Sequence, residues 1–334
     1  MPARRPAPAL VAVAALVALA LLAVTAVLVV RGLEVGPFAP GPQGRNHFAD
    51  RATYVDPDSK ARAAATRARA DGDLELADRL DELASVPSGI WLTPEQHPIG
   101  AVGAYVTGLV SSADERDEVP LLVLYGVPER DCAGLLSAGG LPPEDYPVWV
   151  GEVAAALGTA VGPAVVVLEP DALATAEECG RRDERVDQLG AAVDLLADAG
   201  VTTYVDAGHS DWIPARAMAR MLEEVGVARV RGFATNVANY QRDADEQAYA
   251  RTLDELLPAA QHWVVDRGRN GNGATDEWCN PPESTLGQRP GFVDDGSGLD
   301  AYLWVKPPGE SDGTCGGGPP AGEFWAEGAL RLLR

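Results

Sequence analysis

Seven short apolar runs recur between residues 89 and 307, and this repeat constrains the fold more than any other feature of the chain. The runs are GIWLT (89–93), PLLVLYGV (120–127), AVVVLEP (164–170), TTYVDAG (202–208), RGFATNV (231–237), HWVVDRG (262–268) and AYLWVKP (301–307). Segments between them, such as QLGAAVDLLADAG and PARAMARMLEEVG, place apolar residues at helical steps of three and four. Strands that alternate with helices form a parallel sheet. We therefore predict an α/β fold with a seven-stranded parallel (β/α) barrel, similar to a TIM barrel that lacks one strand; a doubly wound open sheet is the alternative.

Residues 1–33 form a separate apolar segment. Two arginines precede Ala9–Val30, which contains no charged residue, and Arg31 follows it. A helix of this length spans roughly 33 Å, enough to cross a bilayer core. We predict a transmembrane helix that anchors the protein with its N-terminus in the cytoplasm. The alternative is a cleaved signal peptide, for which AVTA (23–26) could serve as the cleavage site.

A Pro/Gly linker, residues 34–45, follows the apolar segment and contains GPFAPGPQG. Such a composition predicts no regular structure. Beyond the linker there is no second break, so residues 46–334 are expected to form one domain. Under either interpretation of the N-terminus this domain is exported: it lies on the extracellular side of the membrane, or it is secreted if the segment is cleaved.

Charge and cysteine content exclude several classes of partner. The net charge of −22 argues against nucleic acid, which requires basic surface, and favours a neutral or cationic ligand. The four cysteines are an even number in an exported domain and predict two disulfides. No CxxC or HxxxH spacing is present, so neither a metal nor another cofactor is expected.

Polar and aromatic side chains follow most of the predicted strands. In a parallel barrel the carboxyl ends of the strands open onto one face, where the active site lies. Any one of these residues could be an ordinary loop residue, but their concentration predicts a site. They are Trp91, Tyr125, Asp131, Glu169, Asp171, Asp206, His209, Trp212, Asn236, Asn239, Arg267, Arg269, Lys306, Glu310 and Asp312.

Four of these residues, Asp131, Asp171, Asp206 and Asp312, are carboxylates expected in one cleft. Crowded carboxylates repel one another, so at least one should keep its proton near neutral pH. An acid beside ionised partners is what cleavage of a glycosidic bond requires. The absence of GxSxG argues against a serine hydrolase. Metal binding is the other use of such a cluster, and the basic residues of the same face argue against it.

Four aromatic residues are expected at the same face: Trp91, Tyr125, Trp212 and Trp278. Their flat rings could stack on the C–H faces of sugar rings. The alternative for each tryptophan is a structural role, in which it packs a loop onto the barrel.

Several motifs together resemble those of a known family. They are VLEPDAL, YVDAGHSDWI, GFATNVANY, DRGRNGNG, WCNPP and LWVKPPGESDGTC. In this order they are similar to the signatures of glycoside hydrolase family 6, the inverting cellulases, and the match runs from about His47 to the C-terminus. The resemblance implies a distorted seven-stranded barrel, which agrees with the strand pattern.

The resemblance also implies catalytic roles. Asp171 matches the catalytic acid of the family, and Asp131 matches the aspartate that helps to keep this acid protonated. Asp312 matches the residue often proposed as the base, which acts directly or through a chain of water molecules. Tyr125 matches the tyrosine that distorts the sugar at the cleavage point.

Further roles follow from the same resemblance. The family pairs its cysteines in order, which implies Cys132–Cys179 and Cys279–Cys315. His209 is followed by SDWIP, where the family more often has SGWLGW. Glu169, by contrast, is expected from its place at the end of a buried strand to be a buried supporting carboxylate, hydrogen-bonded below the floor of the cleft. The positions that resemble substrate-binding residues are Trp91, Asp206, His209, Trp212, Asn236, Trp278, Lys306 and Glu310.

These observations predict an inverting endo-β-1,4-glucanase that acts on a β-glucan as a monomer. Endo action is expected because the segments after PERDC and WCNPP are too short to roof a cleft over several sugar rings. The alternatives are a cellobiohydrolase of the same family and an inactive, carbohydrate-binding cell-surface protein.

Overall fold

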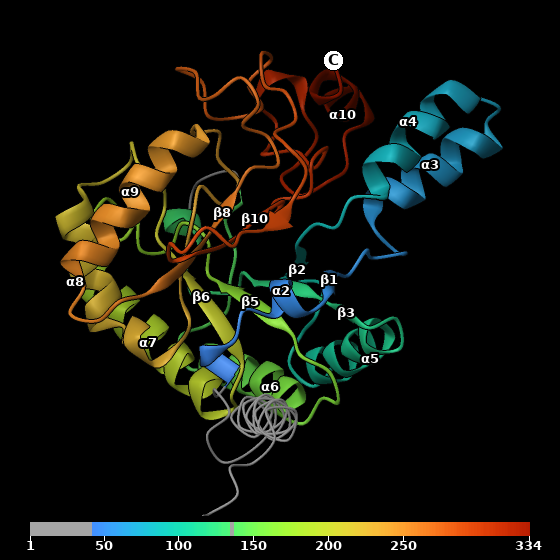
Figure 1. Ribbon diagram of the computed structural model, residues 1–334. Helices are drawn as coiled ribbons and strands as arrows, with labels where there is room; N and C mark the ends of the chain where they lie inside the picture. The colour runs from blue at the N-terminus through green and yellow to red at the C-terminus, as the bar shows by residue number, and fades with distance from the viewer. Residues whose placement is uncertain (1–41, 134–136) are drawn as a thin grey trace, which may run out of the picture. The chain divides into compact units, whose positions relative to one another are not determined.

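A curled sheet of parallel strands runs through residues 46–334 (Figure 1). The computed structural model describes residues 42–133 and 137–334, of which those from Asn46 onward belong to one compact unit. The sheet order is β2-β4-β5-β6-β7-β8-β10-β9, and the first seven strands are parallel neighbours. These seven are the predicted strands: β2 (Ile90–Leu92), β4 (Leu121–Leu124), β5 (Val165–Leu168), β6 (Thr202–Asp206), β7 (Gly232–Thr235), β8 (His262–Asp266) and β10 (Leu299–Leu303).

Two short additions lie outside the predicted pattern. Strand β9 (Gly291–Phe292) pairs antiparallel with β10 at the end of the sheet. Strand β1 (Ala52–Thr53) pairs with β3 (Glu118–Val119) in a separate two-stranded parallel sheet. The last predicted strand was placed at 301–307, whereas β10 begins at Leu299 and ends at Leu303. Beyond Leu303 the backbone bonds other partners, since Trp304 O accepts from Gly89 N and Lys306 N donates to the Asp266 carboxylate, so this part of the run leaves the ladder.

The predicted barrel is correct in the number and direction of its strands but not in its closure. Among the described residues, no ladder joins the end strands β2 and β10. One backbone hydrogen bond, from Gly89 N to Trp304 O at 2.8 Å, crosses between them, and the Trp91 indole donates to Val305 O at 2.9 Å. A Cβ at Gly89 would lie 2.2 Å from Val305 O, so only glycine permits this approach. We call this junction the seam.

Five helices cover the outside of the curled sheet: α5 (Val102–Asp114), α6 (Tyr146–Gly158), α7 (Arg182–Asp198), α8 (Ala215–Glu224) and α9 (Asp243–Leu256) (Figure 1). Successive side chains of a strand point to opposite faces, so each strand contributes to two apolar clusters. On β4, Leu122 and Leu124 pack against the helices, whereas Leu121 and Val123 fill the inside of the curl. This double burial explains why the runs are continuously apolar.

The remaining helices lie outside this layer, and most of them come from the first or last part of residues 46–334. Helices α3 (Lys60–Ala70) and α4 (Leu74–Ala84) form a hairpin, and the side chains of Ser59 and Asp73 cap their N-termini. The hairpin shares an apolar cluster with Trp304 and Ala329. The other short elements are α2 (His47–Asp50), η2 (Asp131–Ala133), η3 (Val227–Arg229), η4 (Cys315–Gly317) and α10 (Ala326–Leu332).

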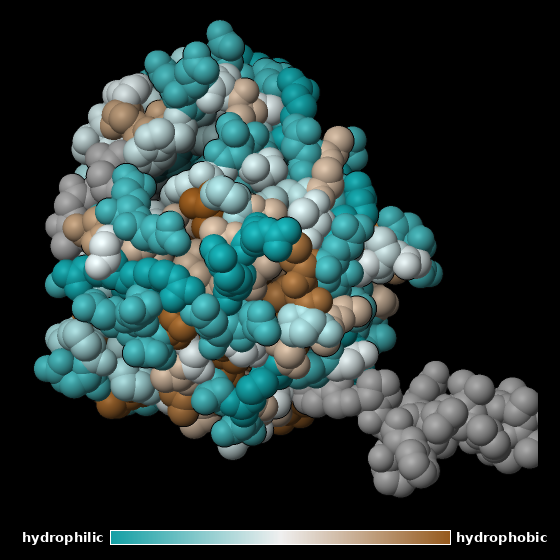
Figure 2. Space-filling view, turned by 90° about the vertical axis from the view of Figure 1, so that its left-hand side faces the viewer, coloured by the Kyte–Doolittle hydropathy of each residue, from teal (hydrophilic) through white to brown (hydrophobic). Residues whose placement is uncertain are grey.

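The surface of the molecule combines hydrophilic and apolar residues (Figure 2). One face is mostly hydrophilic, with separate apolar patches (Figure 2). The predicted transmembrane helix, residues 1–33, lies outside the described residues and stays a prediction. Within residues 42–133 and 137–334, no helix is long and apolar enough to cross a membrane. In the linker, Pro42–Gly44 forms one 3₁₀ turn (η1), although its composition predicted no regular structure.

Candidate active site

The segment Glu169-Pro170-Asp171 leaves the end of β5 with an unusual backbone. Glu169 has φ 50° and Asp171 has φ 69°, the left-handed region that costs energy for residues other than glycine. The Asp171 amide donates to Asp206 Oδ2 at 2.9 Å, and the Glu169 amide donates to Leu124 O on β4 at the same distance. These bonds hold the Asp171 backbone in position at the mouth of the curled sheet.

Three buried carboxylates lie at the strand ends, and we call them the floor carboxylates: Glu169, Asp206 and Asp266. Their relative exposures are 0%, 1% and 2%. Burial raises the pKa of Glu169 to about 7. It also raises the pKa of Asp206, to which the charge of Asp171 adds, and the pKa of Asp266. The expectation that Glu169 is a buried support is confirmed.

The floor carboxylates connect neighbouring loops through backbone amides. Each accepts two or more N–H groups at 2.9–3.1 Å, which satisfies donors that the strand ladders leave unpaired. Glu169 binds the loop after β4, Asp206 binds those after β5 and β6, and Asp266 binds those after β7, β8 and β10. The donors are Gly126 and Val127 to Glu169, Asp171 and Gly208 to Asp206, and Ala238, Gly268 and Lys306 to Asp266.

Asp171 lies in an environment that favours its protonated form. Its pKa is raised to about 7, first because the carboxyl is buried and next because the charge of Asp131 disfavours a second anion. Asp312 acts in the same direction, whereas the cations Lys306 and Arg269 oppose the rise. The structure therefore brings three of the four predicted carboxylates, Asp131, Asp171 and Asp312, into one electrostatic cluster, whereas the fourth, Asp206, is buried and accepts the Asp171 amide.

Asp131 sits in a tight turn beside Tyr125. Its Oδ1 accepts the Tyr125 hydroxyl at 3.3 Å, and its Oδ2 accepts the Ser137 amide at 3.1 Å and the Ser137 hydroxyl. The Tyr125 ring meets the Trp91 ring edge to face, with centroids 5.0 Å apart. Burial raises the pKa of Tyr125 well above its usual value, so the phenol remains neutral.

Arg130 fastens this turn and was not among the residues predicted from the sequence. Its Nη1 donates to Tyr125 O at 2.6 Å, its Nε donates to Ser137 O at 2.8 Å, and its guanidinium lies 4.4 Å from the centre of the Tyr125 ring. A backbone bond from Arg130 N to Gly139 O at 3.1 Å closes the base of the turn. Its one sequence signal was its place beside Asp131 in PERDC.

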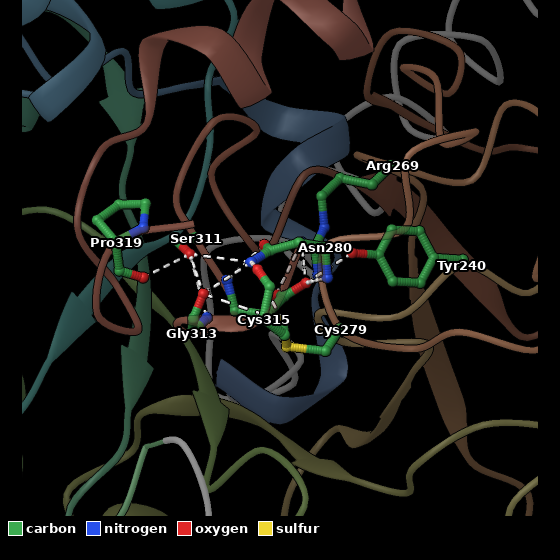
Figure 3. Close-up of a disulfide and its surroundings, with 9 residues drawn as sticks. Tyr240, Arg269, Cys279, Asn280, Ser311, Gly313, Cys315 and Pro319 are labelled. Atoms are coloured by element: carbon green, nitrogen blue, oxygen red, sulfur yellow. Dashed lines mark hydrogen bonds and ion pairs between the residues drawn. A yellow bond between two sulfur atoms is a disulfide. The ribbon is translucent and has the colours of Figure 1, made fainter. Parts of the chain in front are cut away.

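Asp312 is held as an anion on the other side of the cluster. Arg269 Nη1 donates to Oδ1 at 2.8 Å and to Oδ2 at 2.9 Å. Oδ2 also accepts the Tyr240 hydroxyl at 2.7 Å and the Asn280 backbone N–H at 3.0 Å. Tyr240 and Arg269 approach from the side opposite to Pro319 (Figure 3). Burial alone would raise the pKa of Asp312, but Arg269 and Lys306 bring it below its usual value.

Trp91, Lys306 and Glu310 lie near the seam. The Lys306 ammonium is 5.2 Å from the centre of the Trp91 ring, and burial lowers the pKa of this lysine. The Glu310 carboxylate pairs with Lys60 Nζ at 3.0 Å. These three predicted binding residues therefore surround one end of the cluster.

The other predicted binding residues have different environments. The His209 and Trp212 rings lie 5.1 Å apart, and burial lowers the pKa of His209 to about 4, which keeps its ring neutral. Trp278 is 59% exposed. Asn236 is fully buried, and its amide bonds the backbone of Gln241 and Asp266. Asn236 and Asp206 thus point their polar atoms into the protein.

Both implied disulfides are confirmed. Cys132 and Cys179 are bonded with a Cα–Cα distance of 5.3 Å, and Cys279 and Cys315 with one of 6.1 Å. The first bridge directly follows Asp131, and the second flanks the Asp312 loop (Figure 3).

Comparison with known proteins agrees with this geometry. The model of the glycosyl hydrolases family 6 matches residues 48–334. The chain belongs to glycosyl hydrolases family 6. The resemblance inferred from the six motifs is thereby confirmed, and the curled sheet is the α/β fold of this family.

Individual members of family 6 extend the comparison. Endoglucanase A of Cellulomonas fimi is 40% identical over 284 residues, which are 84% of this chain and 60% of the relative. Endoglucanase 1 of Streptomyces halstedii is 38% identical over 304 residues, 86% of this chain and 91% of the relative. The solved endoglucanase Cel6 from Mycobacterium tuberculosis, in complex with a thio-linked cellobioside, is 40% identical with a TM-score of 0.80 and covers 86% of this chain and 98% of that one.

Proposed function

We propose that this family 6 hydrolase is an inverting endo-β-1,4-glucanase in which Asp171 is the general acid. The observation that carries the proposal is the contrast between two carboxyls in one cluster. Asp171 has a pKa raised to about 7, whereas Arg269 keeps Asp312 ionised. Environments that separate the pKa values of two carboxyls are what acid–base cleavage of a glycosidic bond needs.

In this mechanism Asp171 donates its proton to the departing glycosidic oxygen. A general acid works best when its pKa is near the working pH, since it is then protonated and still able to release the proton. The hydrogen bond from the Asp171 backbone N–H to the Asp206 carboxylate fixes the proton donor Asp171 on a rigid support. Asp131 raises the pKa of Asp171 by its charge, and the Tyr125 ring beside it limits the space for the sugar.

Asp312 activates the water that attacks the sugar. Oδ2 already accepts from three residues, but among the described residues Oδ1 accepts from Arg269 alone. The remaining lone pair of Oδ1 can accept a proton from water, directly or through a second water. The low pKa makes Asp312 a weak base, and its charge also stabilises the oxocarbenium-like transition state.

The binding roles follow the surroundings of each side chain. Trp91, Trp212 and Trp278 supply faces for sugar rings, and His209, Lys306 and Glu310 supply hydrogen-bonding groups. Asp206 and Asn236 were expected to bind substrate, but both side chains are buried, and Asp206 Oδ2 and the Asn236 side-chain amide bond backbone groups. We propose instead that these two residues position the loops that carry the site.

Endo action is supported by the short loops and by the relatives. Only a short stretch separates the PERDC motif from α6, which begins at Tyr146, and the segment between Cys279 and Cys315 contains β9 and β10, so little chain remains for a roof. Four relatives named endoglucanase are 36–40% identical, whereas four named exoglucanase or cellobiohydrolase are 29–30% identical. A cellobiohydrolase is the second candidate.

The proposal is tested on a soluble substituted cellulose. An endoglucanase lowers the viscosity of the solution before many reducing ends appear, and NMR should show the α-anomer first. Slow viscosity loss with cellobiose as the main early product would favour the cellobiohydrolase. The β-anomer appearing first would contradict inversion. No reducing ends from any β-1,4-glucan, with binding retained, would favour the inactive carbohydrate-binding protein.

We propose an extracellular location and a monomeric state. The two disulfides are typical of oxidising compartments. Fractionation of cells tests the anchor, because a membrane-anchored form stays in the membrane fraction after a high-salt wash. A soluble form that begins near Val27 would indicate a cleaved signal peptide.

A further inference from the structure

The seam between β2 and β10 contains a pocket with a volume of about 210 Å³. We propose that this pocket binds one further glucosyl unit of an uncharged β-glucan, so that the substrate cleft continues past Trp91 and through the seam. The inference rests on the proposed function, because it assigns the path of the same polysaccharide. The volume lies below the ~300–1,000 Å³ of sites for drug-sized ligands, which suits a single sugar ring.

The pocket shares two lining residues with the candidate active site. Trp91 and Glu310 line it, and Pro307 and Pro308 form the wall just beyond Lys306. The Trp91 ring also touches Tyr125, which bonds Asp131. A chain bound along Trp91 therefore has the pocket as its next open space.

An aromatic pair forms another wall of the pocket. His97 and Tyr105 stack with ring centroids 4.0 Å apart and an interplanar angle of 28°. The backbone of His97 is held by two bonds, from its amide to Thr93 O at 2.8 Å and from the Trp149 indole to its carbonyl at 2.7 Å. Tyr105 is 39% exposed, although it is a large aromatic residue on α5. A rigid, accessible ring is suited to stacking on the C–H face of a sugar.

Polar groups surround the aromatic pair and set the charge of the ligand. Lys60 Nζ binds Glu310 at 3.0 Å and Gly322 O at 2.7 Å, so its charge is already balanced. Asp56 and Asp58 add two further carboxyls to the lining. An anionic sugar would be repelled there, whereas the hydroxyls of a neutral glucan could donate to these carboxyls.

The test compares cello-oligosaccharides of increasing length with the wild-type chain and Tyr105→Ala. Tyr105→Phe is the matched control, because it keeps the ring and removes the hydroxyl alone. We expect Tyr105→Ala to lower kcat/KM about three- to tenfold for oligosaccharides long enough to reach the pocket. It should leave kcat/KM for the shorter ones unchanged, and it should shift the preferred cleavage position in cellohexaose. Tyr105→Phe should resemble the wild type for every length.

A second variant fills the pocket instead of emptying it. Ala61 lines the pocket from the start of α3, and Ala61→Phe should also weaken the long substrates selectively. Binding of cellohexaose to the Asp171→Asn chain, with and without Tyr105→Ala, gives the same comparison without turnover. Equal losses at all lengths, or no loss at any length, would overturn the inference while the proposed function stands. A wild-type chain that hydrolyses no β-1,4-glucan would overturn the proposed function first.

Discussion

The carboxylates at the strand ends form two groups with the same chemistry and different surroundings. The floor carboxylates Glu169, Asp206 and Asp266 accept backbone amides from the loops beside them. We call the second group, Asp131, Asp171 and Asp312, the rim carboxylates. Asp131 and Asp312 are bonded largely by side chains, and the charges of both raise the pKa of Asp171.

The comparison shows that burial alone does not make a carboxyl a functional acid. Glu169 and Asp171 both have pKa values raised to about 7, and burial is the main cause for each. Glu169 has its oxygens occupied by the amides of Gly126 and Val127, so its proton has no route to a substrate. The partners of a carboxyl, more than its pKa, decide whether it supports a loop or performs chemistry.

The largest expected effect on turnover comes from substitution of a rim carboxylate. Asp171→Asn should lower kcat on unactivated glucan by about 10²–10⁴-fold, because general acid catalysis contributes a factor of this size. Its melting temperature should stay close to that of the wild type, since Asp171 donates to the Asp206 carboxylate through its own backbone N–H, which the substitution keeps. The measurement is the release of reducing ends beside a thermal melt. Near-normal turnover would remove Asp171 from the acid role.

Asp131→Asn tests whether the rim carboxylates are coupled. The charge of Asp131 raises the pKa of Asp171, so its removal should lower that pKa. The basic limb of the kcat/KM profile should then move to lower pH, and the rate near neutral pH should fall roughly tenfold or more. An unchanged profile would show that Asp131 acts only as a loop residue.

Glu169→Gln tests the floor, where the effect should appear in stability rather than in turnover. The substitution replaces one acceptor by a donor, so a buried amide loses its partner at a cost of about 1–3 kcal/mol. The folded pKa of about 7 exceeds the ordinary 4.5, so the stabilisation that wild-type Glu169 provides is complete below pH ~4.5 and lost as pH rises through 7.

Chemical unfolding at pH 5 and pH 8 measures this difference. The gap in unfolding free energy between wild type and Glu169→Gln should be larger at pH 5, and kcat should change less than tenfold. The contribution of Asp171 is present in both proteins and cancels in the comparison. A gap that does not depend on pH would contradict the raised pKa of Glu169.

The smallest expected effect on turnover distinguishes the two disulfides. Each closes a loop, with partners 47 and 36 residues apart, and each contributes roughly 3–4 kcal/mol in the chain-entropy model. The Asp312 loop is also held by the side-chain amide of Asn280. Its Nδ2 donates to Gly313 O at 2.8 Å, and its Oδ1 accepts from Asp312 N at 2.9 Å (Figure 3).

Replacement of both cysteines of a pair by serine should therefore have unequal results for kcat. Loss of Cys132–Cys179 should lower kcat several-fold, since the Asp131 turn relies on Ser137 and Arg130. Loss of Cys279–Cys315 should lower stability but change kcat less. Assays below the melting temperature of both variants, beside unfolding curves, make the comparison. Equal losses of kcat would show that the Asn280 bonds do not hold the loop.

Much of the fold followed from local patterns. The continuous apolar runs specify strands buried on both faces, and the three- and four-residue steps specify helices α7 and α8. The order of the motifs specified the family and the disulfide pairing. The last strand was misplaced by its apolar residues Trp304 and Val305, which are buried without joining the ladder.

The roles of individual carboxylates depended on the tertiary structure. The sequence alone determined that acidic residues follow most strands, because period and composition are local properties of the chain. It did not separate Asp206 from Asp171, and it did not single out Arg130, because their partners come from other loops. Closure of the barrel was also decided by packing. The seam rests on contacts between Gly89 and Trp304, residues more than 200 positions apart, and no local pattern reports the distance between such segments.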